Sequence, residues 1–168
     1  DSLQLLALAP QARTWADLGS GAGFPGMPIV CALADTPEAC MHLVESNTKK
    51  AAFLREAARA ADVPAKIHAL RIADFVKKTP ERIEVVTARA VAPLNELLAM
   101  AYPLLIKGAV GLFPKGQGVE AELTEAAKCW KIQASLTPSL TDPKARIVTV
   151  RGLEPISGAH GQKHSAAR

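Results

Sequence analysis

The sequence has few of the residues on which several classes of protein depend. Its three cysteines are scattered and form no CxxC pair, so we expect neither a disulfide framework nor a cysteine metal site, and we expect a reducing cytoplasm. Aromatic residues make up 4% of the chain, too few for a platform of stacked rings that binds single strands. The longest apolar run, 97–106, is ten residues and contains Pro103, so no membrane-spanning segment is predicted.

Metal-binding patterns are also missing. His160 and His164 are four residues apart, but Gly161 and the small residues around them argue against a helical metal site. We therefore expect no metal.

What the sequence does contain is the composition of one soluble globular domain. The chain has 168 residues, of which 49% are hydrophobic and 21% charged, enough for a single substantial core. Its net charge of +4 favours anionic partners such as nucleic acid, although many unrelated proteins carry a similar excess.

Short apolar runs alternate with helical stretches, as in an α/β domain with a mostly parallel sheet. The expected strands are 14–18, 41–45, 65–70, 83–88, 109–114, 132–137 and 146–151, and the expected helices are 25–34, 49–61, 94–102 and 119–130. In helix 49–61 we expect one face to be buried, formed by Phe53, Leu54, Ala57, Ala58 and Ala61. Residues 1–151 are expected to form the domain, and 152–168 a flexible basic tail.

The last two expected strands are joined by a turn-rich segment with no helix between them, which predicts an antiparallel hairpin. Five parallel strands followed by such a hairpin make the seven-stranded, Rossmann-like sheet of class I methyltransferases that use S-adenosylmethionine. Dinucleotide dehydrogenases instead continue with parallel βαβ units.

A glycine-rich loop follows the first expected strand. Gly19, Gly21 and Gly23 let the backbone turn sharply and approach a ligand closely, and the amides that follow can receive a pyrophosphate or a carboxylate. Gly21, Gly23 and Gly26 also match the GxGxxG pattern of NAD-binding proteins, so the loop alone leaves two cofactors open.

Two acidic residues accompany this loop. Asp17, which precedes the first glycine, is expected near the ammonium group of S-adenosylmethionine or its bridging water. Glu45, at the end of the second strand, is expected to accept hydrogen bonds from the ribose diol of the cofactor. Glu45 would serve NAD equally well. The alternatives are that Asp17 caps a helix and that Glu45 pairs with Lys49.

Four segments then carry a specific resemblance. DLGSGAGFPGMP (17–28), VESNTKKAAFLREAA (44–58), ARAVAPLNELL (88–98) and LFPKG (112–116) are similar, in order and spacing, to the bacterial small-subunit ribosomal RNA guanine-N7 methyltransferases, also called the glucose-inhibited division protein B family. The resemblance covers the chain from its first residue to about Arg151, and it implies that residues 1–8 end a helical N-terminal region.

The resemblance implies S-adenosylmethionine as cofactor and small-subunit ribosomal RNA, or an assembly particle containing it, as partner, for a protein that is monomeric and binds no membrane. It places cofactor contacts at Gly19, Phe24, Ile72, Ala73 and Arg89. Many members of the family have Glu at the position of Ala73, so a side-chain contact with adenine there is lost in this chain unless Asp74 supplies it.

The chemistry implied by the resemblance needs no general base, because guanine N7 has a free lone pair. Arg89 is our candidate for orienting the cofactor or the guanine, or for contacting a phosphate; a structural ion pair is the alternative. Lys49, Lys50 and Lys115 are candidates for RNA contacts, with ordinary solvated lysines as the alternative. Two other functions stay open: an NAD-dependent oxidoreductase, and an RNA-binding assembly module without catalysis.

Overall fold

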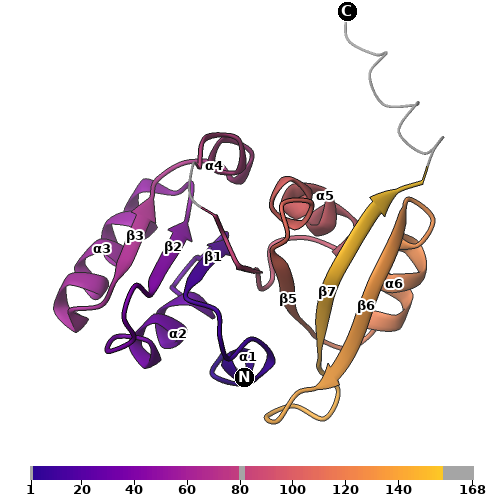
Figure 1. Cartoon of the computed structure of the whole chain (residues 1–168), viewed down its shortest axis with the longest axis horizontal. Helices are drawn as coiled ribbons and strands as arrows, with labels where there is room; N and C mark the ends of the chain where they lie inside the picture. The colour runs from indigo at the N-terminus through magenta and orange to yellow at the C-terminus, as the bar shows by residue number, and fades with distance from the viewer. Residues whose placement is uncertain (1, 80–81, 157–168) are drawn as a thin grey trace, which may run out of the picture.

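Seven strands form one sheet in the order β3-β2-β1-β4-β5-β7-β6 in this computed structural model, which describes residues 2–79 and 82–156 (Figure 1). The strands are β1 (Thr14–Leu18), β2 (Cys40–Val44), β3 (Ala65–His68), β4 (Val85–Thr87), β5 (Val110–Lys115), β6 (Trp130–Pro138) and β7 (Arg146–Pro155). The helices are α1 (Gln4–Leu8), α2 (Gly26–Ala32), α3 (Thr48–Ala61), α4 (Ile72–Lys78), α5 (Leu94–Leu105) and α6 (Val119–Ala126).

Strands β1 to β5 are parallel to one another, and β7 runs antiparallel to both β5 and β6. The predicted parallel sheet with a terminal hairpin is therefore confirmed. Because β1 pairs with β2 on one side and β4 on the other, the strand order reverses between β1 and β4. In open α/β sheets, the carboxyl ends of strands at such a reversal form the crevice that binds ligands.

Helices cover both faces of the sheet. One core cluster joins Leu5 of α1, Ile29 of α2 and Leu54 of α3 to the sheet, and a second cluster joins residues of α4, α5 and α6 to the opposite face. Neighbouring residues of β1 are divided between the clusters, Trp15 in the first and Ala16 in the second. This division follows from the alternation of side chains along a strand. Among the described residues, none of the helices has the length and apolar character needed to cross a bilayer.

Helix α3 begins as predicted, because Asn47 caps it. The Asn47 side-chain oxygen accepts hydrogen bonds from the backbone amides of Lys49 and Lys50, at 3.0 and 3.1 Å. The predicted buried face is wrong at Phe53 and at Ala61, which are both exposed. Leu54 and Ala58 are buried, but the ring of Phe53 is 57% exposed, since it lies on the side of the helix that turns away from the sheet.

The sequence patterns missed α4, which is only seven residues long and buries just Phe75 and Val76. Its start has a consequence for the predicted site, because Ile72 and Ala73 lie in the first turn of this helix rather than in a loop. A two-residue apolar stripe is too short to produce a recognisable helical period.

Three predicted boundaries also move because of packing. Helix α5 continues through Pro103, and the last turn is held by the buried Leu104 and Leu105. Helix α6 ends at Ala126, and Trp130, predicted to end that helix, instead opens β6. Strand β7 continues to Pro155, so the sheet includes four residues assigned to the tail. The rest of the predicted tail, 157–168, and the pair His160 and His164 lie outside the described residues.

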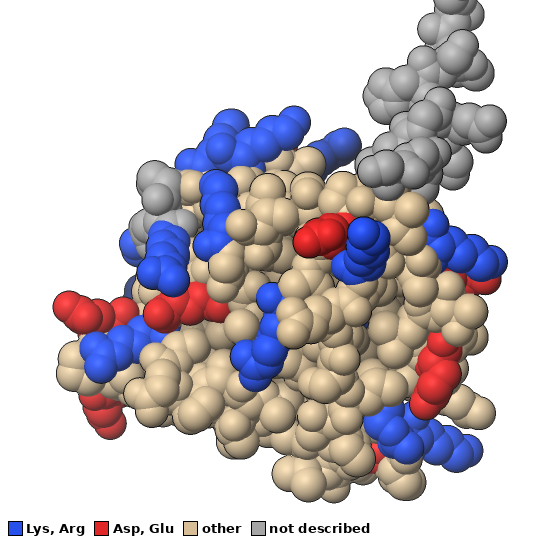
Figure 2. All heavy atoms as spheres, turned by 45° about the vertical axis from the view of Figure 1, so that its right-hand side comes forward, with Lys and Arg blue, Asp and Glu red and all other residues tan. Residues whose placement is uncertain are grey.

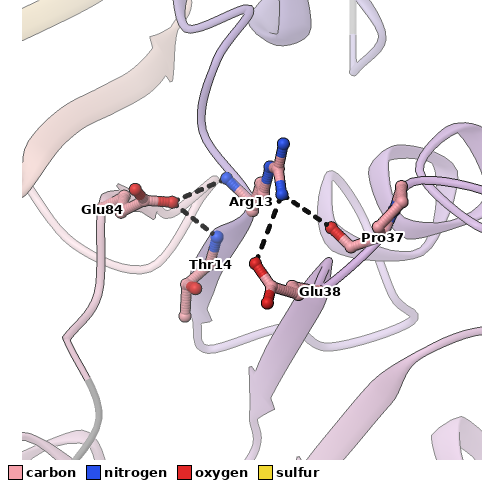
Figure 3. A network of polar contacts seen from close by, with 5 residues as sticks. All are labelled: Arg13, Thr14, Pro37, Glu38 and Glu84. Atoms are coloured by element: carbon pink, nitrogen blue, oxygen red, sulfur yellow. Dashed lines mark hydrogen bonds and ion pairs between the residues drawn. The ribbon is translucent and has the colours of Figure 1, made fainter.

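The amino ends of the strands are tied together by polar contacts (Figure 3). Glu84, which precedes β4, accepts hydrogen bonds from the backbone amides of Arg13 and Thr14 at 2.7 and 2.9 Å. The Arg13 guanidinium donates to the carbonyl of Pro37 and to the carboxylate of Glu38, both at 3.3 Å. The amides that bond Glu84 lower the pKa of its carboxyl from the ordinary 4.5.

Candidate functional site

The glycine loop after β1 is fastened to the end of β2. The backbone amides of Gly19 and Ser20 both donate to the carbonyl of Val44, each at 2.9 Å. Gly19 has a φ of +71°, and a Cβ on it would lie 2.7 Å from a methyl group of Val91. A side chain at this position would be strained and would also collide with the turn after β4, so the close approach of these two loops requires glycine.

Glu45 connects the glycine loop to the start of α3. One carboxylate oxygen accepts from the amide of Gly21 at 2.9 Å, and the other accepts from the amide of Asn47 at 2.8 Å. An ionised carboxylate has about four acceptor sites, so two remain for a ligand. The Glu45 side chain is largely buried, at 8% exposed. Its two charge-assisted hydrogen bonds fix the position of the carboxylate before any ligand binds. The alternative of a pair with Lys49 is wrong.

A cavity of about 330 Å³ opens at the carboxyl ends of β1, β2 and β4. Its walls come from the glycine loop, the β2–α3 junction and the turn after β4: Gly19, Ser20, Gly21, Ala22, Phe24, Glu45, Lys50, Arg89, Ala90 and Val91. The cavity thus lies at the strand-order reversal, where the topology predicts a ligand site. Its volume is in the range of sites for small molecules.

Arg89 and Phe24 form one side of the cavity. The guanidinium carbon of Arg89 lies 5.5 Å from the centroid of the Phe24 ring, within the range of a cation–π contact. Both side chains are exposed, and among the described residues no carboxylate lies within ion-pair distance of Arg89. The alternative of a structural ion pair is therefore wrong within that part of the chain, and the guanidinium donors remain available to a ligand.

Asp17 lies beneath the cavity rather than in its wall, so its predicted place near the cofactor's ammonium group or its bridging water stays a prediction. It is fully buried, and its Oδ1 accepts a hydrogen bond from the Thr87 hydroxyl at 2.9 Å. Its Oδ2 lies beside Gly26 without a partner in hydrogen-bond geometry among the described residues. Burial raises the pKa of Asp17 from 3.8 to about 6, although hydrogen bonds and the charge of Arg89 partly offset it.

Other predicted cofactor residues also lie outside the cavity wall. Gly23 packs against α2, where a Cβ would lie 2.7 Å from the Met27 side chain. Ile72 packs into the core beside α4, while Ala73 is exposed on that helix; neither lines the cavity. Ile72 and Ala73 open α4, the helix that follows β3, and their side chains do not line the cavity.

The three predicted RNA-binding lysines separate into different environments. Lys50 lines the cavity, and Lys49 is exposed beside it on the first turn of α3. Lys115 is largely buried and donates to the Ala92 carbonyl and to Glu122, both at 2.8 Å. These contacts hold its ammonium group and join β5 to α6 and to the turn after β4, which favours the alternative of a structural lysine over an RNA contact.

Sequence analysis missed four residues of the cavity wall. Ser20 and Ala22 alternate with the loop glycines, a position that is itself a signal of proximity to the ligand. Ala90 and Val91 had no signal beyond their place next to Arg89; Ala90 has a φ of +56°, a turn conformation that its side chain does not reveal. In the described part of the chain, no group of His, Cys, Asp and Glu is arranged to hold a metal.

Comparison with known proteins decides the family. The model of the rRNA small subunit methyltransferase G family matches residues 1–150. The chain belongs to the rRNA small subunit methyltransferase G family. The ribosomal RNA small subunit methyltransferase G of Nitrobacter winogradskyi is 56% identical over 154 residues, covering 92% of this chain and 56% of that protein. The protein of the same name from Bradyrhizobium sp. strain ORS 278 is 54% identical, covering 92% and 69%.

The chain thus spans little more than half the length of the first of these relatives. Solved structures match its fold at low identity. The O-methyltransferase TomG from Streptomyces achromogenes, in complex with SAM, has a TM-score of 0.65 at 15% identity, covering 89% of this chain and 77% of TomG. An rRNA methylase from Streptococcus thermophilus has a TM-score of 0.59 at 8% identity, covering 85% and 88%. These likenesses show the class I methyltransferase fold.

Proposed function

We propose that this chain binds S-adenosylmethionine in the cavity above Glu45 and transfers its methyl group to N7 of a guanine in small-subunit ribosomal RNA. The carboxylate of Glu45, held by two backbone amides beside a glycine loop at the strand-order reversal, is the observation that carries the proposal. Its free acceptor positions suit the ribose diol of a nucleoside cofactor. Membership in the methyltransferase G family favours the methyl donor over NAD.

Each cavity residue has a proposed role that follows from its chemistry. Glu45 binds the ribose, and the backbone amides of the glycine loop are placed to receive the cofactor's carboxylate. When bound, the cofactor supplies an electrophilic methyl group. Asp17 supports the loop from below, where Thr87 and the carboxylate join β1 to β4.

Guanine N7 attacks with its own lone pair, so the protein has to orient the reactants and needs no residue to remove a proton. Arg89 is our candidate for this orientation, because its guanidinium lines the cavity beside the exposed ring of Phe24. A donor to the guanine O6, rather than to N7, would leave the nucleophilic lone pair free.

The charge distribution supports an RNA substrate. The stretch from Glu45 to Arg89 contains ten Lys and Arg and six Asp and Glu, so it carries the whole net excess of +4. It includes the cavity residues Lys50 and Arg89 and the helix α4, whose last turn holds Lys77 and Lys78. Figure 2 shows basic side chains gathered at the top of the molecule, where α4 lies in Figure 1. Cations on this edge suit a polyanion.

The first experiment tests the cofactor. Calorimetry of the whole chain should detect S-adenosylhomocysteine binding, and Glu45→Ala should weaken it roughly 10- to 100-fold, because two charge-assisted hydrogen bonds are lost. Glu154→Ala, a surface carboxylate on β7, is the matched control and should bind normally. Binding of NAD in place of S-adenosylhomocysteine would overturn the proposal.

The second experiment tests the reaction. The chain is incubated with labelled S-adenosylmethionine and small-subunit ribosomal RNA, and the product is mapped by borohydride–aniline cleavage, which cuts at N7-methylguanosine. Arg89→Ala should lower kcat roughly 100-fold through loss of orientation, whereas Arg151→Ala on β7 should not. Cofactor binding without methyl transfer would indicate the non-catalytic RNA-binding module. We also propose that the active protein is a monomer, which sedimentation tests, and that it acts in the cytoplasm.

A further inference from the structure

Two of the seven aromatic residues of the chain, all of which lie in its described part, point into solvent. Trp15, Phe75, Phe113 and Trp130 are buried in the core, and Tyr102 packs against Trp130 with ring centroids 5.2 Å apart. By contrast, Phe24 is 49% and Phe53 57% exposed. A single exposed ring needs no explanation, so what matters is where these two rings lie.

Phe53 lies one turn from the cavity. It follows Lys49 by four residues and Lys50 by three, so the three side chains share one surface of α3. Helical side chains lean toward the helix N-terminus, which brings the ring toward the two ammonium groups and the cavity mouth. Lys50 lines the cavity together with Phe24.

The glycine loop and α3 are also in direct contact. A Cβ on Gly23, the residue before Phe24, would lie 3.2 Å from the side chain of Leu54, the residue after Phe53. The two exposed rings therefore project from two segments that pack on each other. Lys50 of the second segment and Phe24 of the first both line the cavity, and Arg89 lies over the face of Phe24.

This combination suits one kind of ligand. Aromatic faces bind nucleobases by stacking whatever their sequence, and ammonium groups bind the phosphates between them. We propose that Phe53 stacks on a nucleobase that neighbours the target guanine, while Lys49 and Lys50 hold the adjoining phosphates. This inference rests on the proposed function and adds to it the conformation of the substrate, which is single-stranded RNA with the neighbouring base unstacked from the target.

The low content of aromatic residues argues against a platform of several stacked rings. The proposal is compatible with this scarcity, because the single ring of Phe53 suffices to stack one base. The charge count places the basic excess on the stretch 45–89, which includes α3. The proposed RNA-binding surface therefore extends from the cofactor cavity along α3 to Phe53.

The test measures binding of a short single-stranded oligoribonucleotide that has one guanine flanked by 2-aminopurine. With the whole chain and S-adenosylhomocysteine present, Phe53→Ala should weaken RNA binding about 5- to 100-fold, the usual effect of losing one stacked base. Phe53→Trp should restore the affinity to within about twofold, while Phe53→Leu, which keeps apolar bulk but no ring, should not. Transfer of 2-aminopurine from its stack on the guanine to the ring should change its fluorescence in the wild type and in Phe53→Trp, but not in Phe53→Ala or Phe53→Leu.

Ile106→Ala is the matched control, since Ile106 is also 57% exposed but lies between the end of α5 and the amino end of β5, away from the carboxyl ends of the strands that form the cavity; it should change nothing. Equal RNA affinity in Phe53→Ala and the wild type, or a fluorescence change that survives the substitution, overturns the inference. The inference is also overturned if Phe53→Ala reduces self-association of the chain and leaves RNA binding unchanged, because Phe53 would then be a contact for a second copy. If the wild type methylates RNA and Phe53→Ala does so with the same KM, this inference alone fails. If the wild type binds S-adenosylhomocysteine but no RNA, the proposed function fails first.

Discussion

Substitution of Asp17 by Asn should stabilise the protein at neutral pH, with an effect that depends on pH. The folded carboxyl has a pKa of about 6, against 3.8 ordinarily, because burial disfavours its charged form. A group whose pKa is raised by folding contributes most stability below its unfolded pKa, and that contribution is lost as the pH rises through the folded pKa. The difference of about two pKa units corresponds to about 3 kcal/mol of destabilisation above pH 7.

Asparagine removes this cost because it is neutral at every pH and can still accept the hydrogen bond from Thr87. We expect Asp17→Asn and the wild type to have similar free energies of unfolding at pH 4, and the variant to be more stable by about 3 kcal/mol at pH 7.5. Urea unfolding followed by circular dichroism from pH 3.5 to 8 measures the difference. A difference that stays constant over this range would refute the reasoning.

Glu84 supplies a control of opposite sign. Amides lower the pKa of this carboxyl, so its contribution is present above the ordinary pKa of 4.5 and is lost as the pH falls through the lower folded value. Glu84→Gln should therefore be less stable than the wild type at neutral pH and converge with it in acid. If both variants shift with pH in the same direction, the assignment of burial and hydrogen bonding to these two groups is wrong.

Three further substitutions test the site. Gly26→Ala should destabilise the protein by about 1–3 kcal/mol in urea unfolding, because its methyl group would overlap the side chain of Leu43; a neutral effect would contradict the close approach. Glu45→Gln should reduce S-adenosylhomocysteine affinity less than Glu45→Ala does, since an amide oxygen still accepts a hydrogen bond; equal losses in calorimetry would argue against a role as acceptor. Lys115→Met should lower the free energy of unfolding by about 1–3 kcal/mol through loss of the contact with Glu122, and leave RNA affinity unchanged; weaker RNA binding would restore Lys115 as an RNA contact.

Much of the site was determined by local sequence. The glycines after β1 adopt positive φ angles that few other residues tolerate, and Asn47 caps α3 through its own side chain. Glu45 follows an apolar strand directly, so its position at the carboxyl edge of the sheet follows from the strand itself. Chain order and the late hairpin likewise predicted the parallel sheet and its antiparallel end.

Tertiary packing decided the rest, because burial and pairing depend on residues far apart in the sequence. Whether Asp17 faces a ligand or lies beneath the cavity is set by β4, whose Thr87 is 70 residues away. Lys115 is held by Glu122 and the turn at Ala92, which no local pattern of charge reveals. Phe53 has an apolar side chain typical of a core residue, and it is exposed only because α3 packs on the sheet with another face. Sequence periodicity finds the helix, but the surface on which it packs fixes which side remains in water.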